Sequence, residues 1–509
     1  MTRVLLGIFF LFYITFGYGQ TVSFCAAGDI LLDRGIRNAI TIKHDINYPF
    51  KKISNFVNKT DLAFANLESS VALPNPQYRI KRPYSFRADT QFLNGVKYCG
   101  FDILSVANNH SFDMSQQGFI QTINFIKKYG FIPIGYCTRK KPFSPVNIVK
   151  KGIKFTFFAY EDFYLAVAPQ NLNQPFACGR ETPLNLLCDS IKKYSQISDW
   201  VIISIHCGEE ERNLPTDRQK FIAHKLIDCG ADMIIGQHPH VLESIEIYKD
   251  RLIIYSLGNF VFDNPKKNQR KTALFMCVFT KNHISNLRFL PVIIKHYQPT
   301  VANKELAKEI YSDLKKYSSE FNTPLNFQNN QIYINYNFPY IIGKYIYDKL
   351  LFTFTPNGII AYTPTVQKIY INKPEYKMQN FIVHKFKNTL YFYTFYSKKG
   401  KKRLVIAAYD LSKKKFILSK KDVKIHILKI NKATFLTLSY YLKNGDKIEL
   451  FYDASMFSPN FILWHLPKNI KELIEGNFKQ IFIKYTHMGK TNIFIVSPIK
   501  TSYFYSSVI

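Results

Sequence analysis

Two histidines separated by one residue, His238 and His240, follow an apolar run near the middle of the 509-residue chain. Pro239 restricts the backbone between the two imidazoles. Asn259 and Asp263 add an amide and a carboxylate about twenty residues later. Imidazole is a common metal ligand, and it exchanges protons near neutral pH. The stretch therefore predicts a metal clip or a phosphate clamp at the end of a buried strand.

Polar side chains of similar kinds end other apolar segments that predict buried strands. The whole set is Asp29, Glu68, Asn109, His110, His206, His238 and His240. Because α/β proteins place functional groups beyond the carboxyl ends of their strands, we expect these side chains to meet. Asp29 taken alone has an equally good alternative role as the cap of the next helix.

The composition of this set indicates the chemistry. Carboxylate, amide and imidazole ligands suit zinc, manganese or iron(II) better than calcium, and the set lacks the thiolates of a structural zinc site. A centre of this kind can polarise a phosphoryl or carbonyl oxygen and generate hydroxide near neutral pH. His110, next to the amide of Asn109, is placed to protonate a leaving group.

Two segments of the chain resemble each other, Val96–His110 and Leu226–His240. Each has a helix end, Cys-Gly, an Asp, an apolar strand, then an amide and a histidine. The two glycines fit the position just after a helix end. The pattern is expected if two halves of one fold deliver ligands to one site, and it is also compatible with ordinary α/β architecture.

A proline-containing loop, residues 77–87, carries four basic side chains. They are Arg79, Lys81, Arg82 and Arg87. Such a loop either faces an anion or is solvated, and we favour the solvated interpretation.

The length and the strand pattern predict the domain organisation. A chain of 509 residues is expected to hold two or three domains. Residues 303–321 have helical periodicity and look like the end of the first domain. From residue 326 onward, short aromatic and β-branched runs alternate with Lys, Asn and Gly. This pattern predicts an all-β domain over 326–509, after a first domain over 20–325.

The chain is strongly basic, with a net charge of +32. Residues 326–509 hold 28 Lys and Arg against 9 Asp and Glu, so the excess is densest there. The charge fits an anionic surface, an acidic polymer or nucleic acid, and equally a lysine-rich compositional bias. The lysines are spread between strands rather than gathered in one patch, and we predict no nucleic-acid partner.

The first nineteen residues have the pattern of an export signal. Arg3 precedes the apolar run 4–16, and Gly19 gives a small residue at a cleavage position. We expect a signal peptide over 1–19 and a secreted, periplasmic or envelope location; the alternative is an uncleaved anchor.

All eight cysteines lie before residue 278. Export would permit disulfides, and Cys178 with Cys188 is the most favourable local pair. Most of the others stand in apolar segments and are expected to be buried thiols.

Several motifs together carry a family resemblance. In chain order they are GDILLDR from Gly28, NLE from Asn66, ANNHSFD from Ala107 with Gly118 after it, HCGE from His206, GQHPHV from Gly236 and YSLGNFVFD from Tyr255. They resemble the CapA-type capsule and poly-γ-glutamate synthesis family, over residues 21–321. That family is similar to the calcineurin-like metallophosphatases, which implies a four-layer α/β/β/α sandwich.

The resemblance implies roles for single residues. The implied ligands of one or two divalent ions (Mn, Zn or Fe) are Asp29, Glu68, Asn109, His206, His238 and His240. His110 resembles the acid or phosphate-contacting histidine, Arg34 a substrate contact, and Asn259 a residue that shapes the site.

Three positions depart from the expected pattern. A metallophosphatase has a histidine two residues after its first aspartate, where this chain has Leu31. Its second carboxylate is an aspartate, where this chain has Glu68. Cys207 stands where the CapA-type family usually has an aromatic residue.

These features predict a secreted CapA-like protein of capsule or poly-γ-glutamate synthesis. We expect a metal-dependent hydrolase of phosphoester or amide bonds in an anionic envelope polymer, acting within a membrane-associated synthesis complex. The alternative is a non-catalytic protein that binds a polyanion during polymer assembly or export. A secreted α/β protein with no site at all fits the polar strand ends poorly.

Overall fold

A computed structural model describes most of the first two thirds of the chain and the strands of the remainder. The described residues are 20–143, 145–163, 171–180, 182–263, 266–341, 343–347, 350–355, 358–362, 366–370, 377–386, 389–398, 401–413, 415–418, 425–430, 433–441, 447–453, 481–487 and 490–496. The predicted signal peptide lies outside them. The chain divides into two compact units, the first comprising Met1–Ile227 with Ala231–Phe338 and the second Pro339–Ile509 with Asp228–Gly230.

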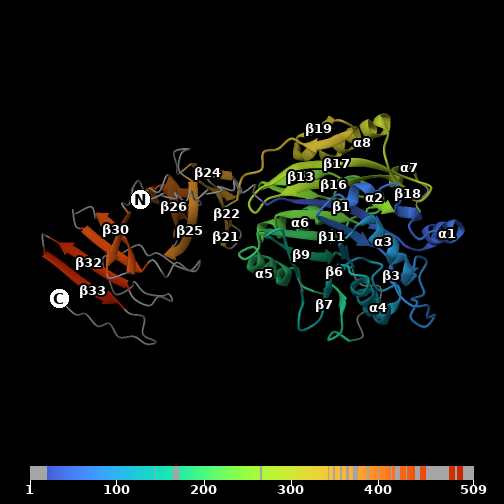
Figure 1. The fold of residues 1–509 in the computed structure, drawn as a ribbon, viewed down its shortest axis with the longest axis horizontal. Coiled ribbons are helices and arrows are strands. Elements are labelled where there is room, and N and C mark those ends of the chain that lie inside the picture. Colours follow the sequence, from blue (N-terminus) through green and yellow to red (C-terminus); the bar gives the residue numbers. More distant parts are fainter. Residues whose placement is uncertain are drawn as a thin grey trace, which may run out of the picture. The chain divides into compact units, whose positions relative to one another are not determined.

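The first unit contains a ten-stranded mixed sheet (Figure 1). Its strands are, in spatial order, β19 (Leu325–Gln328), β20 (Gln331–Ile334), β17 (Ile284–Lys295), β16 (Lys271–Phe279), β1 (Val22–Ile30), β2 (Leu62–Leu67), β5 (Ile103–Ser105) and β6 (Ile132–Ile134), with β15 (Asn259–Val261) on β1 and β18 (Gln298–Val301) on β17. Strands β1, β2, β5 and β6 run parallel, and β15 is also parallel to β1.

A second sheet has six strands. They are, in order, β13 (Ile245–Tyr248), β14 (Arg251–Ile254), β12 (Met233–Gln237), β11 (Trp200–His206), β9 (Ile153–Glu161) and β8 (Val146–Lys150). Strands β9, β11, β12 and β14 are parallel. One apolar core joins the two sheets, and Phe24 of β1 contacts Phe157 of β9 with ring centroids 6.3 Å apart. The chain thus has a mixed α/β fold rich in sheet.

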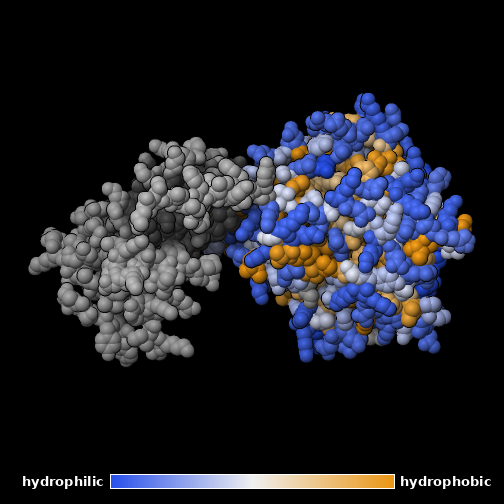
Figure 2. Space-filling model, viewed as in Figure 1, coloured by the Kyte–Doolittle hydropathy of each residue, from blue (hydrophilic) through white to orange (hydrophobic). Residues whose placement is uncertain are grey.

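Eight helices accompany these sheets in the described part of the first unit. They are α1 (Arg34–Lys43), α2 (Ser54–Val57), α3 (Leu93–Cys99), α4 (Ser115–Lys128), α5 (Leu184–Tyr194), α6 (Asp217–Asp228), α7 (Lys267–Arg270) and α8 (Lys304–Tyr317). The visible face of this unit is largely hydrophilic, with apolar side chains over the region of α5 and α6 (Figure 2). Leu186 of α5 and Phe221 of α6 are exposed there.

Strand composition explains why the polar residues lie at one edge of each sheet. The segment Trp200–His206 is entirely buried and rich in β-branched residues, as a strand covered on both faces must be. Its chain direction then places His206 at the carboxyl end. The same holds for Asp29 near the end of β1 and for His238 just after β12. Parallel strands bring their carboxyl ends to a common edge, which is where this fold class forms sites.

The two similar segments of the sequence use the same local device. The backbone N–H of Asp102 donates to the carbonyl of Ala63 over 2.9 Å, and the Asp102 carboxylate accepts the N–H of Ala63 over 2.8 Å. Asp232 exchanges the same two hydrogen bonds with Val201, at 2.8 and 2.9 Å. Each aspartate thereby fixes the start of its strand against the neighbouring parallel strand.

The first unit extends beyond the predicted domain boundary. Strands β19 and β20 form a hairpin whose β20 pairs with β17 of the ten-stranded sheet. Leu325 and Ile332 belong to the same apolar core as Leu314 of α8. The boundary thus falls after Phe338 rather than after residue 325. Alternating aromatic and β-branched residues continue across it, so composition alone did not reveal the change of unit.

The second unit contains antiparallel strands in its described segments. They are β21 (Gly343–Tyr347), β22 (Leu350–Thr355), β23 (Gly358–Tyr362), β24 (Val366–Tyr370), β25 (Lys377–Phe386), β26 (Thr389–Lys398), β27 (Lys401–Asp410), β28 (Lys415–Leu418), β29 (Ile425–Ile430), β30 (Ala433–Tyr441), β31 (Lys447–Asp453), β32 (Ile481–His487) and β33 (Lys490–Val496). The connections between many of them lie outside the described residues, and an all-β domain over this region stays a prediction. Among the described residues, no helix combines the length and apolarity needed to span a membrane.

The cysteines pair differently from the sequence prediction. Cys178 is bonded to Cys137, not to Cys188, and Cys188 and Cys229 are also disulfide-bonded. The Cys137–Cys178 bond joins two short strands, β7 (Tyr136–Cys137) and β10 (Phe176–Ala177), that pair with each other. Proximity in the sequence was a poor guide because the sheet brings together residues that are 41 positions apart. The other cysteines, Cys25, Cys99, Cys207 and Cys277, are buried thiols.

Candidate metal centre

Glu68 lies at the meeting point of two groups of potential metal ligands. One group is Glu68, His206 and His238, and the other is Asp29, Glu68 and His240. Within each group the candidate ligand atoms lie within 4.8 Å of one another. Every member is buried. Because Glu68 belongs to both groups, one carboxylate is placed to serve two neighbouring cations.

The first group is contributed by both sheets. His206 ends β11, and its Nε2 lies 3.7 Å from a carboxylate oxygen of Glu68, which follows β2. The Nδ1 of His238 lies 3.2 Å from the same Nε2. The amide oxygen of Asn109 is 2.9 Å from that atom. Nitrogen and oxygen atoms with lone pairs thus converge on one small volume, as a cation site requires.

The second group is centred on His240. Its Nδ1 lies 3.5 Å from Asp29 and its Nε2 3.8 Å from Glu68. The amide oxygen of Asn259 lies 2.9 Å from His240 Nδ1, and the Asn259 amide group donates to the carbonyl of Gln269. Asn259 is therefore placed to orient the His240 ring.

Asn66 contacts one member of each ligand group. Its side-chain N–H group donates to Asp29 over 2.8 Å and lies 3.2 Å from Nδ1 of His206. The side chain of Asn108 donates in turn to the Asn66 amide oxygen over 3.2 Å. Such outer contacts fix the orientation of metal ligands. In the sequence Asn66 begins the NLE motif, and its orienting role depends on a register that the sequence does not display.

The electrostatics of Glu68 fit a cation. Its side chain is fully buried, and within the described part of the chain neither carboxylate oxygen has a hydrogen-bond partner. Burial, and then the neighbouring charge of Asp29, raise the pKa of Glu68 well above its ordinary value. A buried carboxylate without partners is costly, and a divalent ion would supply the missing countercharge.

The histidines divide into two electrostatic types. Burial and the neighbouring imidazoles lower the pKa values of His206 and His238 well below the ordinary value. Both rings are thus neutral, which is the form that binds metal. Burial opposes charge on His240 as well, but Glu68 and Asp29 outweigh it and raise the pKa of His240 to about 9. A proton on His240 and a cation between those carboxylates are alternative ways to balance the same negative charge.

The turn that carries the two histidines has an unusual backbone. His238 has φ 100° and His240 φ 60°, in the region that side chains other than glycine rarely occupy. The turn is held closely, because a Cβ at Gly236 would lie 1.8 Å from the carbonyl oxygen of Tyr255. Non-glycine residues in this region cluster at functional sites, where packing pays for the strain.

His110 stands at the rim of the centre and contacts a carboxylate and a guanidinium. Its Nε2 lies 3.8 Å from Glu68, and its Nδ1 lies 2.8 Å from Asp113. Burial lowers the pKa of His110, against the opposing effect of Asp113. The Arg82 guanidinium forms an ion pair with Asp113 and lies 3.0 Å from His110 Nδ1. Asp113 thus orients a largely neutral imidazole whose other nitrogen faces the ligands.

The position of Arg82 corrects the solvated interpretation of the loop 77–87. Its side chain donates to the carbonyl of Asn109 over 2.8 Å, in addition to its contacts with His110 and Asp113. Four basic residues in one loop were the available signal. Their spacing could not distinguish the one side chain that points inward.

Arg34 forms the opposite wall, held between aromatic rings. Its guanidinium lies 4.8 Å from the ring centroid of Phe86 and 5.6 Å from that of Phe262, and it forms an ion pair with Asp263. Leu31 packs in a small apolar cluster with the same two phenylalanines. A fully buried leucine thus occupies the position expected for a histidine ligand, yet the group of Asp29, Glu68 and His240 is complete without it.

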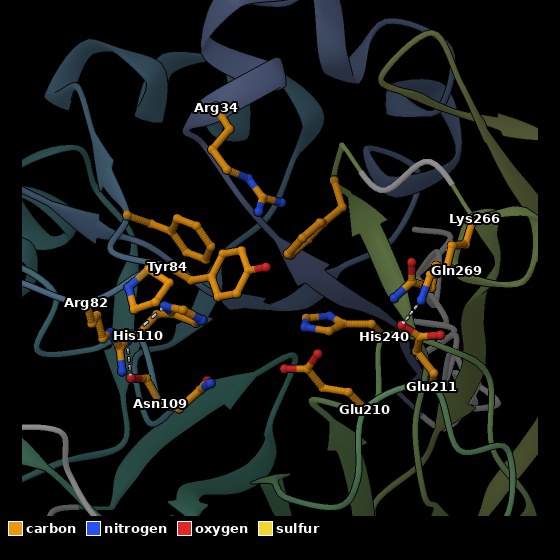
Figure 3. A pocket seen from close by; sticks show the side chains of 13 residues that line it. Arg34, Arg82, Tyr84, Asn109, His110, Glu210, Glu211, His240, Lys266 and Gln269 are labelled. Atoms are coloured by element: carbon orange, nitrogen blue, oxygen red, sulfur yellow. Dashed lines mark hydrogen bonds and ion pairs between the residues drawn. The ribbon is translucent and has the colours of Figure 1, made fainter.

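A cavity of about 450 Å³ opens over the centre. Its charged and polar lining includes Arg34, Arg82, Asn109, Glu210 and Lys266. Figure 3 shows the lining side chains converging from several segments, with Arg34 on one wall and Glu210 on the other. The volume falls in the range of small-molecule sites.

The structure brings six of the predicted residues within a few ångströms of one another: Asp29, Glu68, Asn109, His206, His238 and His240. His110 and Asn259 border this group, whereas Arg34 lines the cavity farther out. The contributions of Arg82, Asn66 and Glu210 were missed.

Residues 23–264 match the family model described as Bacterial capsule synthesis protein PGA_cap. The chain is 29% identical over 312 residues to the capsule biosynthesis protein CapA of Bacillus anthracis, an alignment that covers 59% of this chain and 74% of that protein. It is 28% identical over 294 residues to the PGA biosynthesis protein CapA of Bacillus subtilis (strain 168), covering 55% of this chain and 74% of that protein.

Among solved structures, the putative 5'-nucleotidase of Staphylococcus aureus in complex with α-ketoglutarate is similar with a TM-score of 0.37. The two sequences are 11% identical, and the match covers 58% of each chain.

Proposed function

We propose that the chain, whose residues 23–264 match the family model of the bacterial capsule synthesis protein PGA_cap, is a metal-dependent hydrolase of capsule or poly-glutamate synthesis. Its substrate is a phosphoester or amide bond in an anionic envelope polymer. The observation that carries the proposal is Glu68, a buried carboxylate shared by two ligand groups and lacking a hydrogen-bond partner among the described residues.

The candidate ligands fit one or two ions of zinc, manganese or iron. Neutral imidazoles from His206 and His238 favour a borderline metal over calcium or magnesium. Asp29, Glu68 and His240 offer a harder second set. A bound divalent ion would polarise the scissile group and lower the pKa of water at the site.

The other site residues act on the substrate and on protons. His110, whose Nδ1 is held by Asp113, would act as the acid toward the leaving group in its protonated form, which also carries a proton on Nε2. Arg34 and Arg82 line the cavity, where their guanidinium N–H groups would position an anionic group of the substrate. Asn259 keeps the His240 ring in place. The phenylalanines around Arg34 exclude water from that wall.

The finer features of fold and location are proposals too. We propose that the first unit has the four-layer α/β/β/α arrangement of metallophosphatases, on the support of the Phe24–Phe157 contact between its sheets. We also propose export through residues 1–19 and action at the cell envelope. There the basic residues of 326–509 would favour an anionic polymer.

Metal analysis and hydrolysis assays test this function together. The mature protein, incubated with Mn²⁺, Zn²⁺ or Fe²⁺ and then dialysed, should retain at least one ion per chain. It should then hydrolyse a chromogenic phosphodiester or a glutamyl anilide. His206→Ala and His238→Ala should lose both metal and activity.

An exposed histidine outside the site provides the matched control. His44→Ala should keep both the metal and the activity, because His44 follows α1 on the surface. A wild-type protein that takes up no metal but binds polyglutamate would contradict the hydrolase and support a polymer-binding role.

A further inference from the structure

Glu210 is the one lining carboxylate of the cavity with no hydrogen bond or ion pair to any described residue. Its carboxylate points into the pocket between Asn109 and His240 (Figure 3). The charge is close enough to the centre to contribute to the raised pKa values of Glu68 and His240. Glu210 is exposed to solvent, so its carboxylate is free to contact a ligand that enters the cavity.

The loop that carries Glu210 is tied to the histidine turn. The backbone N–H of Glu211 donates to the carbonyl of Pro239 over 2.8 Å, and Glu211 has φ 64°. The N–H of Cys207 donates to the carbonyl of Gln237 over 3.2 Å. The two hydrogen bonds join the segment after β11 to the last residue of β12 and to the turn that follows it. The Glu210 side chain is therefore positioned by the same backbone that positions His238 and His240.

The lining cations already have carboxylate partners. Arg34 is paired with Asp263, Arg82 with Asp113, and Lys266 with Glu211. Each pair leaves little net charge, so Glu210 remains as an uncompensated negative group. A phosphate dianion bound at the centre would be repelled by it. A substrate with a positive group beside the reacting carbonyl would be attracted instead.

We propose that Glu210 binds a primary ammonium group next to the scissile bond, so that the substrate is the amino-terminal residue of an acidic peptide chain. Arg34 lies on the opposite wall and retains N–H donors for the carboxylate of that residue. Glu210 and Arg34 together would select a polymer end that carries both an ammonium group and a carboxylate. This inference rests on the proposed hydrolase function. It favours an amide bond over a phosphoester bond as the substrate.

The reaction that follows is the hydrolysis of one amide bond. The C–N bond breaks and a C–O bond forms from water. The carbonyl carbon leaves as a carboxylate on the released amino acid, and the departing nitrogen takes a proton. The shortened polymer keeps a new free amino terminus, which is again a substrate. No oxidant or co-substrate other than water is required.

Binding of the product tests the inference without relying on turnover. Isothermal titration of the full-length mature protein with Mn²⁺ present would use L-glutamate, N-acetyl-L-glutamate and glutarate. Wild type should bind L-glutamate about 10- to 100-fold more tightly than either analogue, since a charged hydrogen bond is lost in both. Glutarate controls for the bulk of the acetyl group. Glu210→Gln should bring this ratio close to one.

Glu209 is the matched control, because it neighbours Glu210 but is ion-paired with Arg212 and does not line the cavity. Glu209→Gln should keep the wild-type ratio. Three results would overturn the inference: a wild-type ratio near one, an equal loss in Glu209→Gln, or loss of metal from Glu210→Gln, which would make Glu210 a ligand.

A kinetic comparison separates this inference from the function on which it rests. α-Glutamyl-p-nitroanilide carries the ammonium on the carbon next to the scissile carbonyl, its N-acetyl derivative does not, and bis-p-nitrophenyl phosphate has neither charge pattern. If none of the three compounds is hydrolysed but L-glutamate is still bound preferentially, the proposed hydrolase function is wrong and the ammonium site stands. Hydrolysis that favours the phosphodiester and is indifferent to acetylation would remove the ammonium site and keep the hydrolase.

Discussion

Glu68→Gln should change the stability of the protein in opposite directions with and without metal. In the metal-free protein Glu68 is buried beside Asp29, and its two oxygens lack hydrogen-bond partners among the described residues. The substitution removes the like charge and keeps the shape. In the metal-bound protein the same substitution removes the only residue common to both ligand groups.

The magnitudes follow from these contacts. A buried charged group without a hydrogen-bond partner costs more than a neutral one, and Glu68→Gln replaces the charge by a neutral amide, so we expect the variant to stabilise the metal-free protein by about 1–3 kcal/mol. Wild type gains about 2.7–4.1 kcal/mol from a metal present at 100 to 1,000 times its Kd. For a unit of this size, 1 kcal/mol corresponds to roughly 2–4 °C in Tm. The variant should therefore melt about 2–12 °C above wild type in chelator and below it in saturating metal.

Thermal unfolding followed by tryptophan fluorescence provides the assay, because Trp200 is buried on β11 of the first unit. Wild type and variant are compared in EDTA and in Mn²⁺, with Glu209→Gln as the control that should behave as wild type. A variant that is destabilised equally in both conditions would refute the reasoning. It would mean that Glu68 serves packing rather than a cation.

Three further perturbations address other parts of the account. Asp113→Asn should lower kcat by about 10²–10⁴-fold with little change in KM or metal content, because His110 loses the carboxylate that orients its ring; steady-state kinetics and metal analysis check this. Burial raises the pKa of Glu243 to about 8, and its proton is therefore held more tightly in the folded state. The contribution of this proton to the free energy of unfolding is fully present below about pH 4.5 and is lost as the pH rises towards 8. Glu243→Gln should remove this decline in urea unfolding measured across that range, with a difference on the order of 4 kcal/mol at pH 8. Replacing Cys137 and Cys178 together by serine should cost about 2–4 kcal/mol of unfolding free energy, whereas an unchanged midpoint would show the bond to be dispensable.

The part of the candidate centre that lies at strand ends could be predicted from the sequence. Asp29, His206 and His238 each follow an apolar run, and the carboxyl ends of parallel strands meet at one edge. Both the ligand types and their convergence could therefore be inferred before any geometry was available. The predicted helix over 303–321 corresponds to α8, with small shifts at its ends.

What could not be inferred depends on side-chain direction within loops. Arg82 and Glu210 stand in charged segments whose neighbours are exposed, and no periodicity distinguishes the one residue that points inward. The disulfide partner of Cys178 was missed because contacts between sheet strands are long-range in sequence. The domain boundary was placed too early because the hairpin after residue 325 has the same composition as the strands beyond Phe338.

The most direct test of the metal centre is an anomalous-difference map from crystals of the protein grown with Mn²⁺. The account predicts a peak between Glu68, His206 and His238, and a second between Asp29, Glu68 and His240 when both groups are filled. Either peak should vanish in Glu68→Gln. A map with no peak within bonding distance of Glu68, from crystals saturated with the metal, would contradict the central claim.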